Sequence, residues 1–160
     1  MTRVPAQGRP AAAGLRSDVA TLIVAEPPSA YARRPRLVVD ASVVAAAVFA
    51  EPEIGEAFAW MHGRALCAPS LLGYELASVA AIKVGRNAVE ASAARAALEA
   101  LAALDLEQHE VEAAQVFELA VRYRLTAYDA AYLWLAAELG APIATFDAQL
   151  GAAARRHLAG

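Results

Sequence analysis

The chain of 160 residues is poor in several residue types, and each shortage excludes something. Its single cysteine, Cys67, cannot form an internal disulfide, and its apolar neighbours indicate a buried small side chain rather than a nucleophile. Charged residues make up only 19% of the chain, whereas disordered chains are highly charged and poor in apolar residues. No apolar run reaches the roughly 20 residues that a bilayer crossing requires. We therefore expect a folded domain in a reducing cytoplasm, with no membrane partner.

Familiar catalytic and ligand-binding motifs are missing too. The sequence contains no G-x-x-x-x-G-K-[ST] or G-x-G-x-x-G loop for phosphate and no G-x-S-x-G motif for a nucleophilic serine. Its three histidines, at 62, 109 and 157, are far apart in the sequence. We therefore predict neither a histidine pair nor a histidine–cysteine pair, the groups that zinc prefers.

Hydrophobic residues are abundant, at 59% of the chain, but 44 residues are alanine, which orders readily in helices and fills little core volume. The net charge of −3 argues against a polybasic nucleic-acid or membrane-surface binder. Residues 1–35 carry a net charge of +3 and residues 36–160 one of −6. Twelve glutamates accompany only five aspartates, so the positions of the aspartates are the more informative.

Two regions differ in composition. Residues 1–35 contain five of the eight prolines and are predicted to be a flexible, proline-rich leader. Alternatively, residues 1–35 are an over-extended start, and the true beginning of the protein lies close to residues 33–36. Residues 36–160 are predicted to form one domain.

Short apolar strands alternate with helices in that domain, a pattern typical of a three-layer α/β fold with a parallel sheet. The expected strands cover residues 37–39, 65–68, 108–111 and 142–146. The expected helices cover about 42–50, 52–61, 69–84, 87–104, 112–123, 126–140 and 147–156. Pro52 and Pro69 are expected in first helical turns, and Asn87 with Glu90 is expected to form a capping box.

Four acidic residues are predicted to meet at one edge of this sheet. Asp40 and Asp147 each follow a strand directly, so both carboxylates emerge at the same edge if the two parallel strands are neighbours. Glu75 lies near the start of the helix after the second strand, and Asp129 lies in the first turn of the helix before the fourth strand. Clustered carboxylates repel one another unless a cation is present, and oxygen ligands suit Mg²⁺ or Mn²⁺.

Each acid also has a purely structural explanation. Asp129 and Asp147 occupy positions where an aspartate commonly caps a helix, and taken singly either is better explained in that way. Asp40, between Val-Val and Ala-Ser-Val-Val, is costly to bury unless it is paired or bound to a metal ion. Glu75 is surrounded by apolar residues on its helix, and a position on a solvated face of that helix is the alternative.

The acids stand in sequence blocks that together resemble PIN-domain ribonucleases, and especially the toxin of VapBC toxin–antitoxin pairs. The blocks, in order, are Val38–Ser42, Tyr74–Ala77, Leu125–Tyr132 and Ala144–Leu150. The resemblance covers about residues 36–155 and implies a parallel sheet of four or five strands flanked by helices. The family usually has a final edge strand, whereas this chain has only His157–Gly160 after the last predicted helix.

The resemblance implies a Mg²⁺- or Mn²⁺-dependent endoribonuclease that a VapB-like antitoxin inhibits by covering the site, and it implies a homodimer. Carried over by motif, Asp40, Glu75, Asp129 and Asp147 would be the catalytic and metal-binding acids. Ser42 and Thr145 would support them by orienting a ligand carboxylate or a water molecule, with caps or turn hydroxyls as the plain alternative.

Two further groups of residues bear on partners. RNA would be attracted by basic side chains, with surface solvation as the alternative for each; the candidates are Arg64, Lys83, Arg86, Arg95, Arg122 and Arg124. Phe58 and Trp60 lie where the family's antitoxin groove is expected.

Two other functions compete with the ribonuclease. A different phosphoryl-transfer enzyme or a receiver-like domain needs a positioned lysine and a second aspartate beside the first, which Ala41 and Ser42 do not provide. A non-catalytic interaction domain would use the acids only as helix caps.

Overall fold

The computed structural model describes residues 34–159, so the predicted leader lies almost entirely outside the described residues. Four strands are present in the described range: β1 (Arg36–Val39), β2 (Ala65–Pro69), β3 (Leu106–His109) and β4 (Ile143–Ala144). They form one parallel sheet in the order β3-β2-β1-β4. Because β1 and β4 are neighbours, the predicted proximity of the two chain segments that follow them is confirmed.

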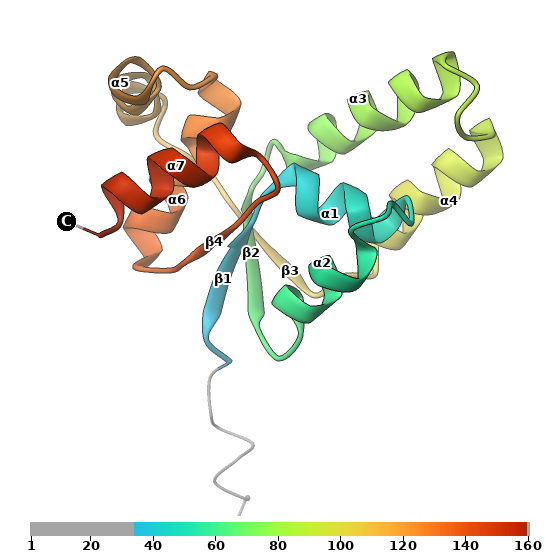
Figure 1. Cartoon of the computed structure of the whole chain (residues 1–160), viewed down its shortest axis with the longest axis horizontal. Helices are drawn as coiled ribbons and strands as arrows, with labels where there is room; N and C mark the ends of the chain where they lie inside the picture. Colours follow the sequence, from blue (N-terminus) through green and yellow to red (C-terminus); the bar gives the residue numbers. More distant parts are fainter. Residues whose placement is uncertain (1–33, 160) are drawn as a thin grey trace, which may run out of the picture. The chain divides into compact units, whose positions relative to one another are not determined.

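Seven helices flank this sheet within residues 34–159, which confirms the predicted α/β class. They are α1 (Ala41–Val48), α2 (Ile54–Met61), α3 (Leu72–Gly85), α4 (Ala91–Ala102), α5 (Ala113–Tyr123), α6 (Ala127–Leu139) and α7 (Ala148–His157). Figure 1 shows α1–α4 on one side of the sheet and α5–α7 on the other. No described helix is long and apolar enough to cross a membrane.

The core lies where the two helical layers meet the sheet. Val38 and Val39 of β1 are fully buried, as expected for the apolar run of a central parallel strand. Leu72 and Leu76 of α3 are buried as well, and so is Tyr132 of α6. Since α6 packs against three of the strands, Tyr132 belongs both to the core and to the carboxyl end of the sheet.

Several predicted boundaries are wrong. Pro69 is the last residue of β2 and Pro52 precedes α2 by two residues, so neither stands in a first helical turn. Asn87 does not begin α4. Its φ of 53° places it in the left-handed region, and the N-cap of α4 is Glu90, without a side-chain capping bond. Asparagine tolerates this conformation better than most residues, which explains the turn that separates α3 from α4.

The two outer strands also differ from expectation. The third strand begins two residues earlier than predicted, at Leu106, and the fourth is reduced to Ile143 and Ala144. After α6, Gly140 adopts a φ of 57° at the C-cap, a conformation that glycine takes without steric cost. The chain therefore turns sharply into β4.

Candidate active site

Asp40 is the most deeply placed of the four predicted acids. It follows β1 and caps α1, and only 5% of its surface is exposed. Its backbone N–H donates to the carbonyl oxygen of Ala144 at 3.0 Å, which continues the β1–β4 pairing. The carboxylate therefore stands at the carboxyl edge of the sheet, where parallel α/β sheets bind ligands.

Two hydroxyl groups orient this carboxylate. Ser42 Oγ donates to Asp40 Oδ2 at 2.6 Å, and Thr145 Oγ1 donates to the same oxygen at 2.8 Å. Each hydroxyl also accepts a backbone N–H, from Phe146 to Ser42 at 3.0 Å and from Asp147 to Thr145 at 2.9 Å. Among the described residues, the side-chain donors to Asp40 all address Oδ2, which leaves Oδ1 for another ligand.

Glu75 lies in the first turn of α3 and accepts a hydrogen bond from the hydroxyl of Tyr132. The pKa of Glu75 is raised to about 7, chiefly by burial; the Tyr132 hydrogen bond lowers the pKa, and the charges of Asp40 and Asp129 add to the increase. Burial and the Glu75 carboxylate in turn raise the pKa of Tyr132, so its hydroxyl remains protonated and donates. The structure thus brings Glu75 close enough to Asp40 and Asp129 for their charges to interact.

Asp129 and Asp147 have the capping contacts that their positions predicted. Thr126 caps α6 and donates its hydroxyl to Asp129 Oδ2 at 2.6 Å. Asp147 caps α7, and its Oδ1 accepts the backbone N–H of Leu150 at 2.7 Å. Asp147 is exposed and contributes no resolved charge effect at Glu75. It is connected to Asp40 through Thr145 instead.

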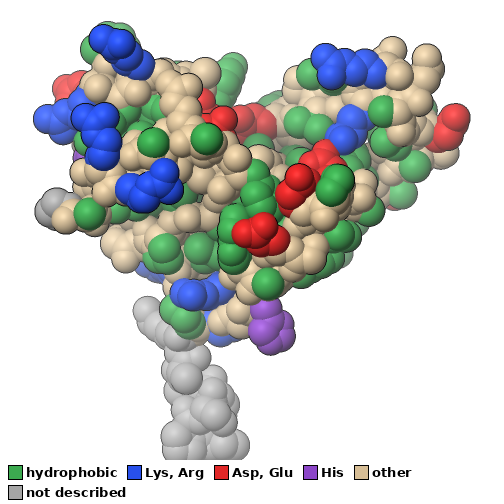
Figure 2. Space-filling view, in the orientation of Figure 1, with side chains coloured by type: hydrophobic (Ala, Val, Ile, Leu, Met, Phe, Trp, Pro, Cys, Tyr) green, Lys and Arg blue, Asp and Glu red, His purple; other side chains and the backbone are tan. Residues whose placement is uncertain are grey.

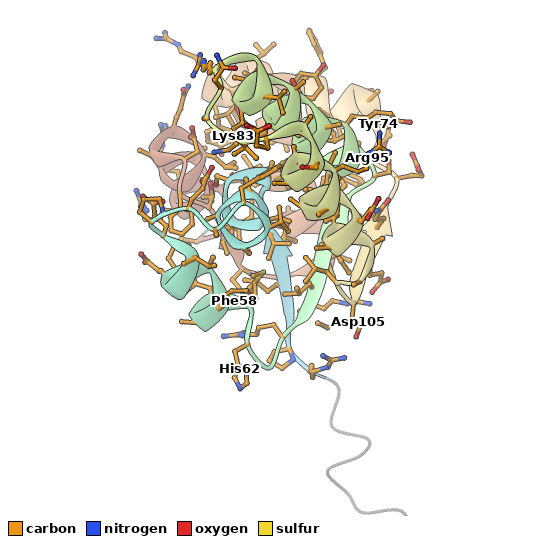
Figure 3. The ribbon with its side chains drawn as sticks, turned by 90° about the vertical axis from the view of Figure 1, so that its right-hand side faces the viewer. Phe58, His62, Tyr74, Lys83, Arg95 and Asp105 are labelled. Carbon is orange, nitrogen blue, oxygen red and sulfur yellow. The ribbon has the colours of Figure 1, made fainter. Side chains whose placement is uncertain are left out.

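A cleft of about 530 Å³ opens beside these acids. Glu75 lines it together with Tyr74 and Tyr128, whose exposed fractions are 82% and 61%. Figure 3 shows Tyr74 pointing away from the body of the protein. Figure 2 shows carboxylates at the base of a notch between the two groups of helices. The site is thus open, acidic at its floor and bordered by aromatic rings.

The donor set of the site suits a hard divalent cation. All of its charged groups are carboxylates, and the charges of Asp40 and Asp129 act on Glu75, a repulsion that a bound cation would relieve. In the described part of the chain, no three of these four acids bring their oxygens within 4.8 Å of one another. Mg²⁺ commonly keeps several waters and takes only one or two carboxylates directly, so this wider spacing remains compatible with it.

Tyr132 is a residue of the site that sequence reasoning missed. Its position three residues after Asp129 indicates a nearby helical face, but the scarcity of large side chains in this alanine-rich chain favours a role in the core. The structure gives it both roles, because a fully buried ring carries a hydroxyl that reaches Glu75. A buried tyrosine needs a hydrogen-bond partner, and that requirement was the signal available in the sequence.

The prediction that no histidine pairs with the cysteine is wrong. Cys67, Glu107 and His109 offer ligand atoms that lie within 4.8 Å of one another. Their strands pair in register, with Cys67 opposite Glu107, so residues distant in sequence meet across the sheet.

The basic residues proposed for RNA attraction differ in their positions and contacts. Lys83 pairs with Glu51 at 2.6 Å and lies over the ring of Phe49, so its charge is already engaged. Arg64 precedes β2 and therefore lies at the edge of the sheet opposite to the acids. Arg122 and Arg124 lie at the end of α5, and the same lobe carries Arg155 and Arg156 in the last turn of α7. Figure 2 shows basic side chains over this lobe.

A larger groove, of about 970 Å³, contains none of the four acids. It is lined by Trp60 of α2, by residues 140–145 around β4 and by Arg155 of α7. Trp60 stacks near Phe146, with 4.8 Å between ring centroids, and Phe58 of the same helix is 51% exposed. This groove lies outside the acidic site.

The parallel sheet, its two helical layers and the acids at its carboxyl edge define an α/β domain with the arrangement of a metal-dependent nuclease. The sequence matches the PIN domain family over residues 37–156, and the chain belongs to that family. PIN domains are generally metal-dependent nucleases.

Comparison with solved structures supports the same fold. The crystal structure of PAE2754 from Pyrobaculum aerophilum matches with a TM-score of 0.61 and 22% sequence identity, over 79% of this chain and 88% of that one. No curated protein matches the sequence.

Proposed function

We propose that this chain is a Mg²⁺- or Mn²⁺-dependent endoribonuclease that serves as the toxin of a type II toxin–antitoxin pair. The observation that carries the catalytic part is the placement of the buried Asp40 and of Glu75 at the carboxyl edge of the sheet, beside an open cleft. Carboxylates crowded in this way at an open cleft favour a bound divalent cation over a set of helix caps.

Asp40, Glu75, Asp129 and Asp147 are the residues that would hold the ion. When bound, it would neutralise phosphate charge, lower the pKa of a bound water and stabilise the leaving oxygen. Ser42 and Thr145 keep Oδ2 of Asp40 occupied, so that Oδ1 faces the ligand in one orientation.

Tyr132 holds Glu75 in place through its hydroxyl and leaves the other carboxylate oxygen open to the cleft.

The surroundings of the acids favour single-stranded RNA as the substrate. Tyr74 and Tyr128 border the cleft with exposed rings, on which unpaired bases can stack. The arginines at the ends of α5 and α7 offer phosphate contacts on one side of the notch. Basic residues outside the acidic floor would offset the charge of −6 that residues 36–160 carry.

Cleavage of end-labelled single-stranded RNA is the direct test. We expect internal cuts that require Mg²⁺ or Mn²⁺ and disappear with a chelator. Asp40→Asn should abolish them, while Asp105→Asn, at an exposed acid paired with Arg34, should cut as the wild type does. Equal cleavage by wild type and Asp40→Asn would disprove the assignment. Cleavage of DNA but not of RNA would identify DNA as the substrate.

The toxin role requires a partner. We propose a VapB-like antitoxin that binds the groove beside Trp60 and the exposed Phe58. We also propose that the chain forms a homodimer and acts in the cytoplasm. Expression of the wild-type chain should arrest growth, Asp40→Asn should not, and co-expression of a small protein encoded beside it should restore growth. Phe58→Asp should weaken that rescue without changing RNA cleavage.

A non-catalytic interaction domain is the competing function, because Asp147 does cap α7 and Asp129 is bonded to the Thr126 cap of α6. It predicts that Mg²⁺ and Mn²⁺ leave the melting temperature of the protein unchanged. Other phosphoryl-transfer enzymes would show the metal effect but no cleavage of RNA.

A further inference from the structure

A second group of potential metal ligands lies on β2 and β3, which β1 separates from β4. Cys67 is paired with Glu107 across the two strands, and His109 follows Glu107 by two residues on β3. Side chains two residues apart on a strand point to the same face, so all three share one face of the sheet. The acids described above belong instead to the ends of β1 and β4 and to α3 and α6.

The three side chains are close enough to share one ion. Their ligand atoms lie within 4.8 Å of one another, and Nε2 of His109 is 3.4 Å from Oε1 of Glu107. Two ligands bound at about 2.0–2.1 Å to one tetrahedral zinc ion would be about 3.3–3.4 Å apart. The Glu107–His109 pair therefore already has the separation that such an ion needs, and Cys67 is within a small side-chain adjustment.

One atom of the group is left unsatisfied. Nε2 of His109 is buried and is the only such side-chain nitrogen or oxygen among the described residues with no hydrogen-bond partner. Its 3.4 Å approach to Glu107 does not make a hydrogen bond, and a buried polar atom without a partner destabilises the fold. A bound cation would satisfy this nitrogen.

The burial of the group is graded from the core outward. Cys67 is fully buried, the side chain of His109 is 21% exposed and that of Glu107 is 56% exposed. An ion can therefore approach from the Glu107 side and reach the sulfur last. Burial raises the pKa of the Cys67 thiol and the charge of Glu107 raises it further, so the thiol keeps its proton until a cation replaces it.

We propose that Cys67, Glu107 and His109 form a zinc site, separate from the acidic site, that joins β2 to the edge strand β3. On binding, the thiol proton leaves to solvent, and sulfur, imidazole nitrogen and carboxylate oxygen become three ligands, with water as the fourth. Sulfur and nitrogen ligands select zinc over Mg²⁺, which prefers oxygen. This site does not depend on the ribonuclease proposal.

Cobalt is the probe, because Co²⁺ occupies zinc sites and absorbs visibly when tetrahedral. Titration of the full chain with Co²⁺, in excess Mg²⁺ to occupy the acidic site, should produce visible ligand-field bands and a near-ultraviolet sulfur-to-cobalt charge-transfer band. The charge-transfer band should saturate at one ion per chain. Added Zn²⁺ should displace both signals and raise the melting temperature.

Variants separate this site from the acidic one. Cys67→Ser should lose the charge-transfer band, and His109→Gln and Glu107→Gln, which keep the thiol, should weaken Co²⁺ binding at least about tenfold. Asp40→Asn should keep the sulfur charge-transfer band, and the exposed control His62→Gln should bind Co²⁺ as the wild type does. A spectrum without the sulfur band, or Zn²⁺ stabilisation that persists in Cys67→Ser and His109→Gln but is lost in Asp40→Asn, would overturn the proposal.

Discussion

The two metal sites proposed for this domain are built in different ways. The acidic cluster uses residues that follow strands or begin helices, and Asp40 is the member that the sheet holds most tightly. The cluster on β2 and β3 uses residues within strands, and the pairing of Cys67 with Glu107 brings it together. The first has only oxygen donors, whereas the second combines sulfur, nitrogen and oxygen. One sheet can thus present a hard site at its end and a softer one on its face.

Loss of the charge on Asp40 should have the largest effect. In Asp40→Asn the amide oxygen still accepts from Ser42 and Thr145, so the fold is expected to survive while the ion loses a ligand. We expect RNA cleavage to fall by about 10³-fold or more, since the ion supplies several kcal/mol of transition-state stabilisation. Initial rates at saturating Mg²⁺ measure this, and an unchanged circular dichroism spectrum establishes that the fold is intact.

Thermal melting in Mn²⁺ should distinguish the clusters next. At 100 times its dissociation constant, an ion that binds only the folded state adds about 2.7 kcal/mol of stability. We expect Mn²⁺ to raise the melting temperature of the wild type and of Cys67→Ser by similar amounts, and to leave Asp40→Asn unchanged. A reversed pattern would place the Mn²⁺ site on β2 and β3.

Removal of one hydroxyl should disturb the acidic cluster alone. Tyr132→Phe keeps the buried ring but takes the donor from Glu75, and hydrogen bonds to charged groups contribute about 1.5–3 kcal/mol. Because that bond lowers the Glu75 pKa, its loss should raise the pKa further. We expect a loss of about 2 kcal/mol at pH 8, measured by urea unfolding. Tyr123→Phe, which loses a contact to His157 elsewhere in the fold, is the matched control.

The smallest effect concerns the pH dependence of stability. Glu75 titrates near pH 7 in the folded protein against an ordinary value of 4.5, so between these values the folded state binds more protons than the unfolded state. Stability should therefore fall as pH rises through this window, by about 1–2 kcal/mol after allowance for solvent screening. Glu75→Gln removes this titration and should be more stable than the wild type at pH 8 but not at pH 4. Parallel pH profiles of the two proteins would contradict the assignment of Glu75.

The acidic cluster was largely predictable because its members are marked by local sequence. Asp40 and Asp147 directly follow apolar runs, and neighbouring parallel strands place such residues at the same edge. Tyr132 was harder to assign, since its partner is 57 residues away and only the packing of α6 against the sheet brings them together.

The Cys67–Glu107–His109 cluster was hidden by an error in the bounds of the third strand. With that strand expected at residues 108–111, Glu107 falls outside it. The observed strand, Leu106–His109, places Glu107 opposite Cys67. A shift of this kind cannot be resolved from the sequence, because three of the four residues 106–109 are polar and show no regular alternation. The pairing of β2 with β3 is what brings Cys67, Glu107 and His109 together.

The two hydroxyls on Asp40 have a consequence for the order in which the protein is made. Thr145 lies 105 residues after Asp40, and its bond to the carboxylate depends on the docking of β4 against β1. During synthesis, Asp40 leaves the ribosome long before Thr145 and Asp147 exist. A nascent chain therefore carries the first acid without the groups that orient it. Any nuclease activity would begin only when nearly the whole domain has emerged, at a distance from the ribosomal RNA of its own exit tunnel.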